Sequence, residues 1–161
     1  MATNTAQTFQ PAFKRVAQSN DFDCVFAVIA MVANKTLAEV RQVAVDKFEV
    51  PEHGPWWPSE SMITGLCAHF GWAGTVYKEA STVADLPDIC LLMVDYNPKT
   101  EMGGRHILFH RQRAAGGVEY TIDPGFWITD PAMQVRVVKS LPPPLWYIGV
   151  HAMNAPKSGN K

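Results

Sequence analysis

The stretch QSNDFDCVFAVIAMVA, residues 18–33, sets a cysteine at the start of an apolar helix, just after two aspartates. Its apolar run from Val25 to Ala33 is too short to cross a membrane and suits a buried helix. Either Asp21 or Asp23 is expected to cap this helix, because a short carboxylate can accept hydrogen bonds from the free N–H groups of a first turn. The stretch therefore predicts a core helix over residues 24–34.

Two further helices are expected next along the chain. Thr36 and Glu39 have the spacing of a capping box and begin a helix over 36–48, and Ser59 caps another over 60–70 that Gly71 ends. The periodicity then changes to that of strands, which are expected at 74–80, 89–96, 105–112, 118–122, 134–138 and 146–152, with one helical turn at 82–85. The sequence AAGG before residue 118 indicates a hairpin.

This order of elements predicts the fold class. Helices followed by strands indicate an α+β protein, with N-terminal helices packed on a mostly antiparallel sheet. A chain of 161 residues can fill one core, so a single domain is expected over 14–153. A polar arm over 1–13 is expected before it and a mobile tail over 154–161 after it.

The composition is that of a folded protein and excludes several classes of partner. Hydrophobic residues make up 47% and charged residues 18%, which argues against disorder. A formal net charge of -1 gives no reason to expect nucleic acid or an anionic membrane as partner. The odd count of three cysteines favours a reducing compartment, and the N-terminus lacks the pattern of a secretory signal. We therefore expect a cytoplasmic protein without a membrane span, and export without a cleavable signal is a second option.

Cys24 is the first candidate for chemistry. A helix N-terminus carries positive potential, which favours the thiolate over the thiol. The neighbouring aspartates oppose this effect, so a cationic neighbour would be needed to hold a thiolate. The alternative is that Cys24 is simply a small apolar residue at the start of a helix.

Three other residues complete a possible catalytic set. His106 begins the strand RHILFHR, where it shares a face with His110 and lies closer to a helix start. Asp123 ends a strand that pairs with this one, where a carboxylate could accept the imidazole N–H and orient the ring. Gln18, six residues before Cys24, could donate to the oxyanion of a tetrahedral intermediate together with the Cys24 backbone N–H. Each of the three also has a non-catalytic explanation. His106 could be a surface or hydrogen-bonded polar residue, Asp123 could belong to an Asp-Pro turn, and Gln18 could be an exposed polar residue.

Together these residues resemble the papain-like cysteine peptidases related to the peptidase domain of bacteriocin exporters, which cut after a double-glycine leader. The resemblance rests on Gln18, the Asp23–Cys24 pair with its apolar helix, LPDICLLMVDY before GGRHILFH, and Ile122-Asp123-Pro124, and it covers residues 15–130. It implies a papain-like fold and a bacterial enzyme with Cys24 as nucleophile, His106 as base, Asp123 as orienting acid and Gln18 in the oxyanion hole. The chain has no transporter or ATPase part, so it resembles the free-standing relatives.

One departure from the family keeps alternatives open. Val25 stands where the family usually has a glycine directly after the cysteine, and its branched side chain is expected to narrow or reshape the substrate cleft. The expected function is hydrolysis of a peptide or isopeptide bond in a protein or peptide substrate. The same residues could serve acyl transfer or deamidation, or the chain could be an inactive module that binds a peptide.

The remaining candidates have structural explanations. Peptidase chemistry of this kind needs no metal or organic cofactor, and Cys67 and His69 point to different sides of a helix rather than forming a metal pair. Cys67 and Cys90 are expected in the core. Trp56 and Trp57 are expected to cover the core under a long loop rather than to line a substrate groove. The oligomeric state is not predicted.

Overall fold

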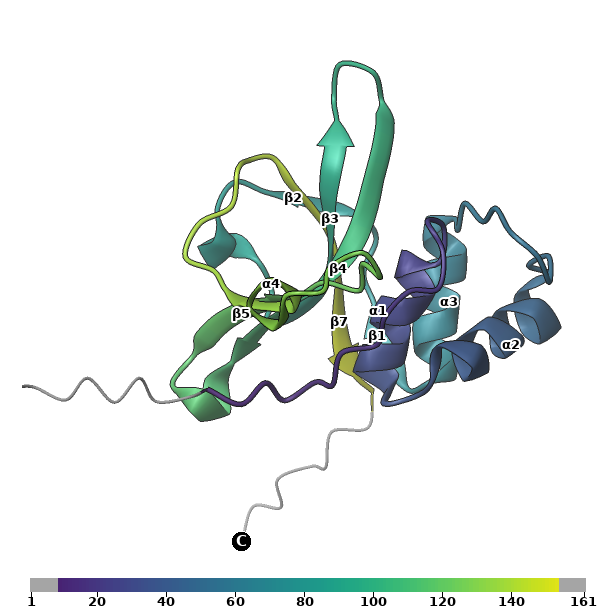
Figure 1. Cartoon of the computed structure of the whole chain (residues 1–161), viewed down its shortest axis with the longest axis horizontal. Helices are drawn as coiled ribbons and strands as arrows, with labels where there is room; N and C mark the ends of the chain where they lie inside the picture. The colour runs from purple at the N-terminus through teal and green to yellow at the C-terminus, as the bar shows by residue number, and fades with distance from the viewer. Residues whose placement is uncertain (1–8, 154–161) are drawn as a thin grey trace, which may run out of the picture.

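The computed structural model describes residues 9–153. Three helices come first: α1 (Cys24–Ala33), α2 (Leu37–Phe48) and α3 (Glu60–His69). They begin and end within one residue of the predicted bounds. Figure 1 shows the three helices gathered at one side of the molecule and the strands at the other. No helix in this part of the chain has the length and apolar character needed to cross a membrane.

Seven strands form one sheet, and every pairing in it is antiparallel. They are β1 (Trp72–Gly74), β2 (Lys78–Ala80), β3 (Ile89–Asn97), β4 (Met102–Gln112), β5 (Val118–Ile122), β6 (Val135–Val137) and β7 (Leu145–Ala152). Their order is β1-β7-β3-β4-β5-β6, and β2 pairs with β7 as well. The predicted α+β class is confirmed at this level.

Two local predictions were incomplete. The segment 74–80, expected to be one strand, is divided into β1 and β2, which pair with opposite ends of β7. The break comes where Thr75 exchanges hydrogen bonds with Gly149, through its backbone N–H at 2.9 Å and its hydroxyl at 3.0 Å. A short helix, α4 (Pro131–Gln134), was not predicted. Two short 3₁₀ turns lie on either side of the β3–β4 hairpin: η1 (Val83–Asp85) precedes β3 and η2 (Arg113–Ala115) follows β4.

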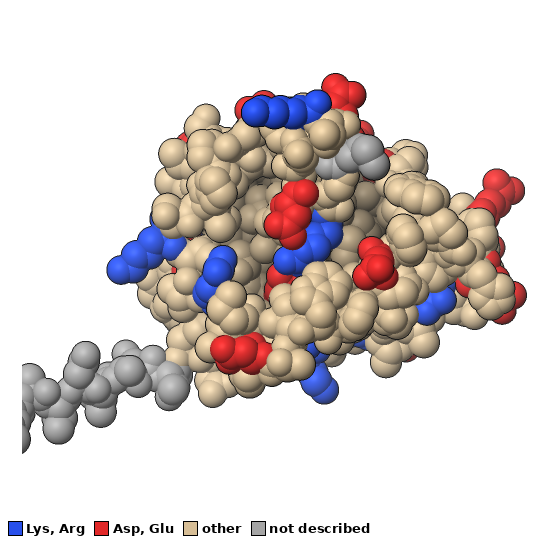
Figure 2. Space-filling model, turned by 45° about the horizontal axis from the view of Figure 1, so that its top comes forward, with Lys and Arg blue, Asp and Glu red and all other residues tan. Residues whose placement is uncertain are grey.

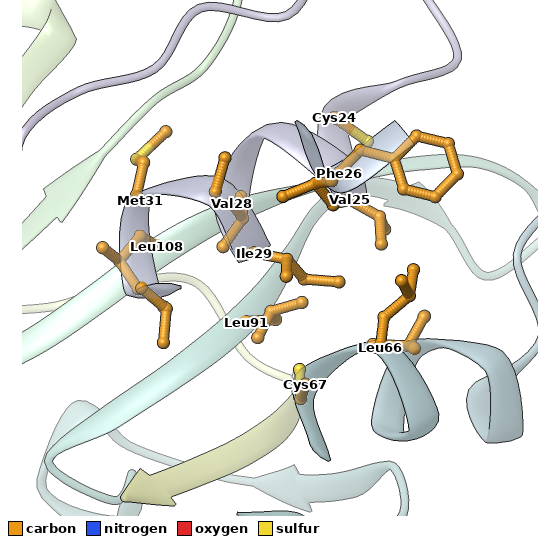
Figure 3. Packing of buried hydrophobic residues seen from close by; sticks show 14 of the residues in the cluster. Cys24, Val25, Phe26, Val28, Ile29, Met31, Leu66, Cys67, Leu91 and Leu108 are labelled. Atoms are coloured by element: carbon orange, nitrogen blue, oxygen red, sulfur yellow. The ribbon is translucent and has the colours of Figure 1, made fainter. Parts of the chain in front are cut away.

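The two faces of the sheet carry separate cores because side chains alternate along each strand. Leu108 of β4 belongs to the core shared with the helices. Its neighbours Ile107 and Phe109 belong to a second core on the opposite face. Nine of the ten residues of α1 are buried, so this helix lies inside the first core (Figure 3). Cys24 is the first residue of this helix.

The helix caps explain where α2 and α3 begin. Thr36 and Glu39 form the predicted capping box at α2. The Ser59 hydroxyl accepts from the N–H of Met62 at α3, as predicted. Gly71, with φ +86°, adopts the left-handed conformation just after α3 that glycine tolerates best.

The segment before α1 lies along the sheet. Phe9 contacts the ring of Tyr120, with ring centroids 4.7 Å apart, and Phe13 contacts His110 at 4.9 Å. The end of the predicted arm therefore packs on β4 and β5. Residues 1–8 of that arm and the predicted tail 154–161 lie outside the described residues.

Candidate active site

Asp23 shapes the loop that leads into α1. Its side chain is fully buried and accepts hydrogen bonds from the backbone N–H of Ser19 at 3.0 Å, the Ser19 hydroxyl at 2.6 Å and the backbone N–H of Asn20 at 3.2 Å. The expectation that an aspartate side chain caps α1 is wrong. Asp23 occupies the N-cap position, but its carboxylate turns back to the loop and makes no bond to the first turn. It thereby fixes the loop that delivers Cys24.

Cys24 and His106 meet where α1 packs on β4. The Cys24 Sγ accepts a hydrogen bond from the backbone N–H of His106, with an N···S distance of 3.4 Å. Each of these residues is 8% exposed. The structure therefore brings together the predicted nucleophile and the predicted base, which are 82 residues apart in the sequence.

Burial dominates the electrostatics of this pair. It raises the pKa of the Cys24 thiol, while the N–H groups of His106 and Val25 and the positive charge of Arg105 act in the opposite direction. Burial lowers the pKa of His106 from 6.5 to about 4. At neutral pH the resting site thus holds a protonated thiol beside a neutral imidazole.

Tyr77 is the third member of the site, and the sequence analysis missed it. Its hydroxyl lies 2.6 Å from Nε2 of His106. The backbone N–H of Tyr77 donates to Oε2 of Glu60 at 2.7 Å, which ties this segment to the first turn of α3. Burial, together with the negative charges of Cys24 and Glu60, raises the pKa of Tyr77 to about 12, so the phenol stays protonated. Tyr77 lies in the break between β1 and β2, inside a segment that the sequence predicted as one continuous strand, so nothing in the sequence singled it out.

Asp123 was predicted to orient His106, but its carboxylate is bound to Arg105 and makes no hydrogen bond to His106. Its two carboxylate oxygens accept hydrogen bonds from Nη1 and Nη2 of Arg105, the latter at 2.7 Å. One of them also accepts from the backbone N–H of Gly125 at 2.9 Å. Arg105 in turn donates through Nε to Asp95 at 2.7 Å and lies over the ring of Trp127.

The register of the β4–β5 hairpin explains this displacement. Leu108 pairs with Ile122, so extending the ladder by one residue sets Asp123 opposite Ile107 rather than opposite His106. Directly opposite residues project to the same face of a sheet. Asp123 therefore shares the face of Ile107 and Arg105, away from the helices. The prediction placed the acid in the right region of the hairpin but on the wrong face.

Gln18 is 2% exposed and lies just ahead of the loop that Asp23 fixes. Its backbone N–H donates to the carbonyl of Pro124 at 2.8 Å, and its Nε2 donates to the carbonyl of Asn20 at 2.7 Å. Among the described residues, its Oε1 has no hydrogen-bond partner. One hydrogen of the Gln18 amide also remains available, since an NH₂ group carries two donors. The role of Gln18 in an oxyanion hole stays a prediction.

The other cysteines and the paired tryptophans lie outside the site. Cys67 and Cys90 are 2% and 0% exposed, and burial raises the pKa of both thiols, that of Cys67 to about 12. Trp56 is 6% exposed and packs on Phe26, as expected for a residue that covers the core, whereas Trp57 is 78% exposed. In residues 9–153 no cluster of three potential ligands is placed to hold a metal ion.

A cavity of about 480 Å³ lies on the face of the sheet that carries Arg105 and Asp123. Ile107, Leu145 and the prolines 142–144 form part of its wall. The space-filling view shows a hollowed surface where acidic and basic side chains lie close together (Figure 2). Cys24 and His106 do not line this cavity, so it is distinct from the site described above.

Comparison of the chain with protein-family models, with curated protein sequences and with solved structures finds no match. The chemistry of the site follows from its groups. A thiol at a helix start, bound to the backbone N–H of a histidine whose ring nitrogen lies against a tyrosine hydroxyl, brings together groups that suit a nucleophile, a general base and an orienting group.

Proposed function

We propose that this chain is a cysteine peptidase with a papain-like fold, which hydrolyses a peptide or isopeptide bond in a protein or peptide substrate. The observation that carries the proposal is the hydrogen bond from the backbone N–H of His106 to the Cys24 sulfur, at the junction of α1 and β4. Three N-terminal helices packed on an antiparallel sheet are the arrangement that such a fold requires. The reaction needs no cofactor. A reducing cytoplasm would keep Cys24 as a free thiol.

The resting protonation states define the proposed mechanism. The Cys24 sulfur attacks the carbonyl carbon, its proton passes to His106, and the electron pair of the C=O bond moves to the oxygen. The Cys24 backbone N–H and the Gln18 amide donate to that oxyanion. His106 then gives its proton to the leaving amine, the C–N bond breaks, and water hydrolyses the thioester. Because the thiol is protonated at rest, proton transfer accompanies the attack.

A library of peptides tests this proposal. Wild-type protein and the variant Cys24→Ala are incubated with the same proteome-derived peptide mixture, and new peptide termini are identified by mass spectrometry. We expect cleavage products with the wild type that are lost in Cys24→Ala and at least about a hundredfold reduced in His106→Ala. Cleavage products that appear equally with the wild type and with Cys24→Ala would overturn the assignment of Cys24 as the nucleophile.

A catalytically inactive peptide-binding module is the second candidate function. It is favoured by one observation: the carboxylate predicted to support His106 is held by Arg105 on the other face of the sheet. The same peptide mixture separates the two functions. Uncut peptides that are retained equally by the wild type and by Cys24→Ala identify a binding module, whereas peptides retained by Cys24→Ala and cut by the wild type identify a peptidase.

A further inference from the structure

His106 is held at two points. Its backbone N–H donates to the Cys24 sulfur, with an N···S distance of 3.4 Å. Nε2, at the far side of the ring, is 2.6 Å from the Tyr77 hydroxyl. A catalytic histidine that uses one nitrogen as a base needs its other nitrogen held, because that bond fixes the ring orientation and the tautomer.

Asp123 cannot supply that bond from the face of Arg105. We propose that Tyr77 is the positioning residue of the site: its hydroxyl oxygen accepts the Nε2–H of His106, which leaves the Nδ1 lone pair free to take the proton of Cys24. This inference rests on the proposed peptidase function and assigns the third member of its catalytic set.

The surroundings of Tyr77 fit a fixed rather than a mobile side chain. The backbone of Tyr77 is held by Glu60 at the start of α3, and Thr75, two residues earlier, is bound to Gly149 of β7. The backbone around Tyr77 is therefore anchored from both a helix and the sheet. A phenol is a weaker acceptor than a carboxylate, so it orients the imidazole but stabilises the imidazolium less. This agrees with a base that is neutral at rest.

The chain contains a matched control. His110, on the same strand and face as His106, has its Nδ1 2.9 Å from the hydroxyl of Tyr120. Tyr120→Phe thus removes a tyrosine–histidine hydrogen bond from the same sheet without touching Cys24. Tyr77→Phe removes the corresponding bond at the site. Glu60→Ala provides a second route to the same residue, because it releases the Tyr77 backbone and leaves the hydroxyl in place.

The experiment measures the rate of Cys24 alkylation by iodoacetamide against pH, read by peptide mass spectrometry. In this reaction the S–C bond forms, iodide leaves, and the thiol proton passes to His106. The wild type is expected to show a rate that changes little between about pH 5 and 8, because neutral His106 assists the protonated thiol throughout that range. In His106→Ala only thiolate reacts, so the rate is expected to rise about tenfold per pH unit.

Tyr77→Phe is expected to lower the level part of this profile by about tenfold or more, Glu60→Ala by less, and Tyr120→Phe not at all. In Tyr77→Phe the His106 ring should change its tautomer, and the ¹⁵N chemical shifts of its two ring nitrogens should report this change. A merely structural role of Tyr77 would leave the tautomer unchanged. If His106→Ala matches the wild type, the proposed function fails. If His106→Ala lowers the rate while Tyr77→Phe keeps or raises it, the proposed function stands and the role of Tyr77 is overturned.

Discussion

Asp123 binds the guanidinium of Arg105, the residue directly before His106, and not the imidazole of His106 itself. Adjacent residues of a strand project to opposite faces, so one step along β4 separates this ion pair from the proposed general base, His106. The positive charge of Arg105 nevertheless lowers the pKa of the Cys24 thiol, against the larger effect of burial. Arg105 is thus a cationic neighbour of Cys24, but its effect on the thiol pKa is smaller than that of burial, so it does not hold a thiolate at rest.

Asp123→Asn distinguishes an ion-pair partner from a catalytic acid. We expect Cys24 alkylation to stay within about tenfold of the wild type, whereas loss of an acid that orients a catalytic base costs about 10⁴ in rate. The free energy of unfolding should fall by about 1–3 kcal/mol, because a partly buried charge pair is broken. Urea unfolding measures this, with Asp95→Asn as control: its carboxylate is 68% exposed and its removal should cost at most about 1 kcal/mol. A loss of 10⁴ in rate would restore Asp123 to the catalytic set.

His106 makes stability depend on pH. Its pKa is about 4 in the folded protein and 6.5 in the unfolded chain, so the unfolded state binds the extra proton between these values. The contribution of neutral His106 to the free energy of unfolding is fully present above pH 6.5. It is lost as the pH falls to about 4, and the total loss is about 3 kcal/mol. Urea unfolding at a series of pH values should show that the free energy of unfolding falls less between pH 6.5 and 4 in His106→Gln than in the wild type. Parallel curves would contradict the burial of a neutral imidazole.

Asp23 holds the loop before the nucleophile by three hydrogen bonds to a fully buried carboxylate. Asp23→Ala should destabilise the fold by about 2–4 kcal/mol, since it leaves the Ser19 and Asn20 donors without their acceptor. Asp21→Ala is the matched control, because Asp21 is exposed in the same loop and should change stability by less than about 0.5 kcal/mol. Thermal unfolding compares the two. Equal losses would mean that the carboxylate of Asp23 does not hold the loop.

Gln18 is predicted to act on the oxyanion rather than on the thiol. Gln18→Ala should reduce cleavage of a peptide found in the library experiment by about 10²–10³, the cost of losing one oxyanion donor. Alkylation of Cys24 passes through no oxyanion, so its rate should change by no more than a few fold. A fall in both rates by the same factor would instead assign Gln18 to the shape of the loop.

The two adjacent tryptophans, Trp56 and Trp57, should contribute very different amounts to the free energy of unfolding. Trp56 is buried, donates from Nε1 to the Pro51 carbonyl at 2.8 Å and lies under the Arg41 guanidinium. Trp56→Ala should cost about 3–5 kcal/mol of unfolding free energy. Trp57 is largely exposed, and Trp57→Ala should cost less than about 0.5 kcal/mol. Urea denaturation decides between this result and a shared role in covering the core.

The sequence predicted the α+β class, the first three helices and most strands because these elements carry local signals. The capping box of Thr36 and Glu39 and the apolar run after Cys24 depend only on neighbouring residues. The meeting of Cys24 with His106 followed from one further rule, the alternation of side chains along β4. The packing of the two cores favours the same helices and strands as these local signals, so the prediction from the sequence agrees with the structure.

The third member of the site could not be predicted in the same way. The face on which Asp123 lies depends on the hairpin register, and a shift of one residue reverses it. Tyr77 reaches His106 from a break between two short strands, and its position depends on contacts with Glu60 and the neighbouring strand β7. Both outcomes are set by tertiary packing, which leaves no periodic pattern in the sequence.

The near-complete burial of α1 has a consequence for how such a protein can diversify. Substitutions along this helix would disturb the core and the proposed nucleophile together, so few of them are expected to be tolerated. Under the proposed function, new specificity would arise in surface segments, such as the loop around Trp57 and the segment that carries Phe126 and Trp127, whose aromatic side chains are exposed. The reactive atom would be inherited unchanged while the recognition surface evolves around it.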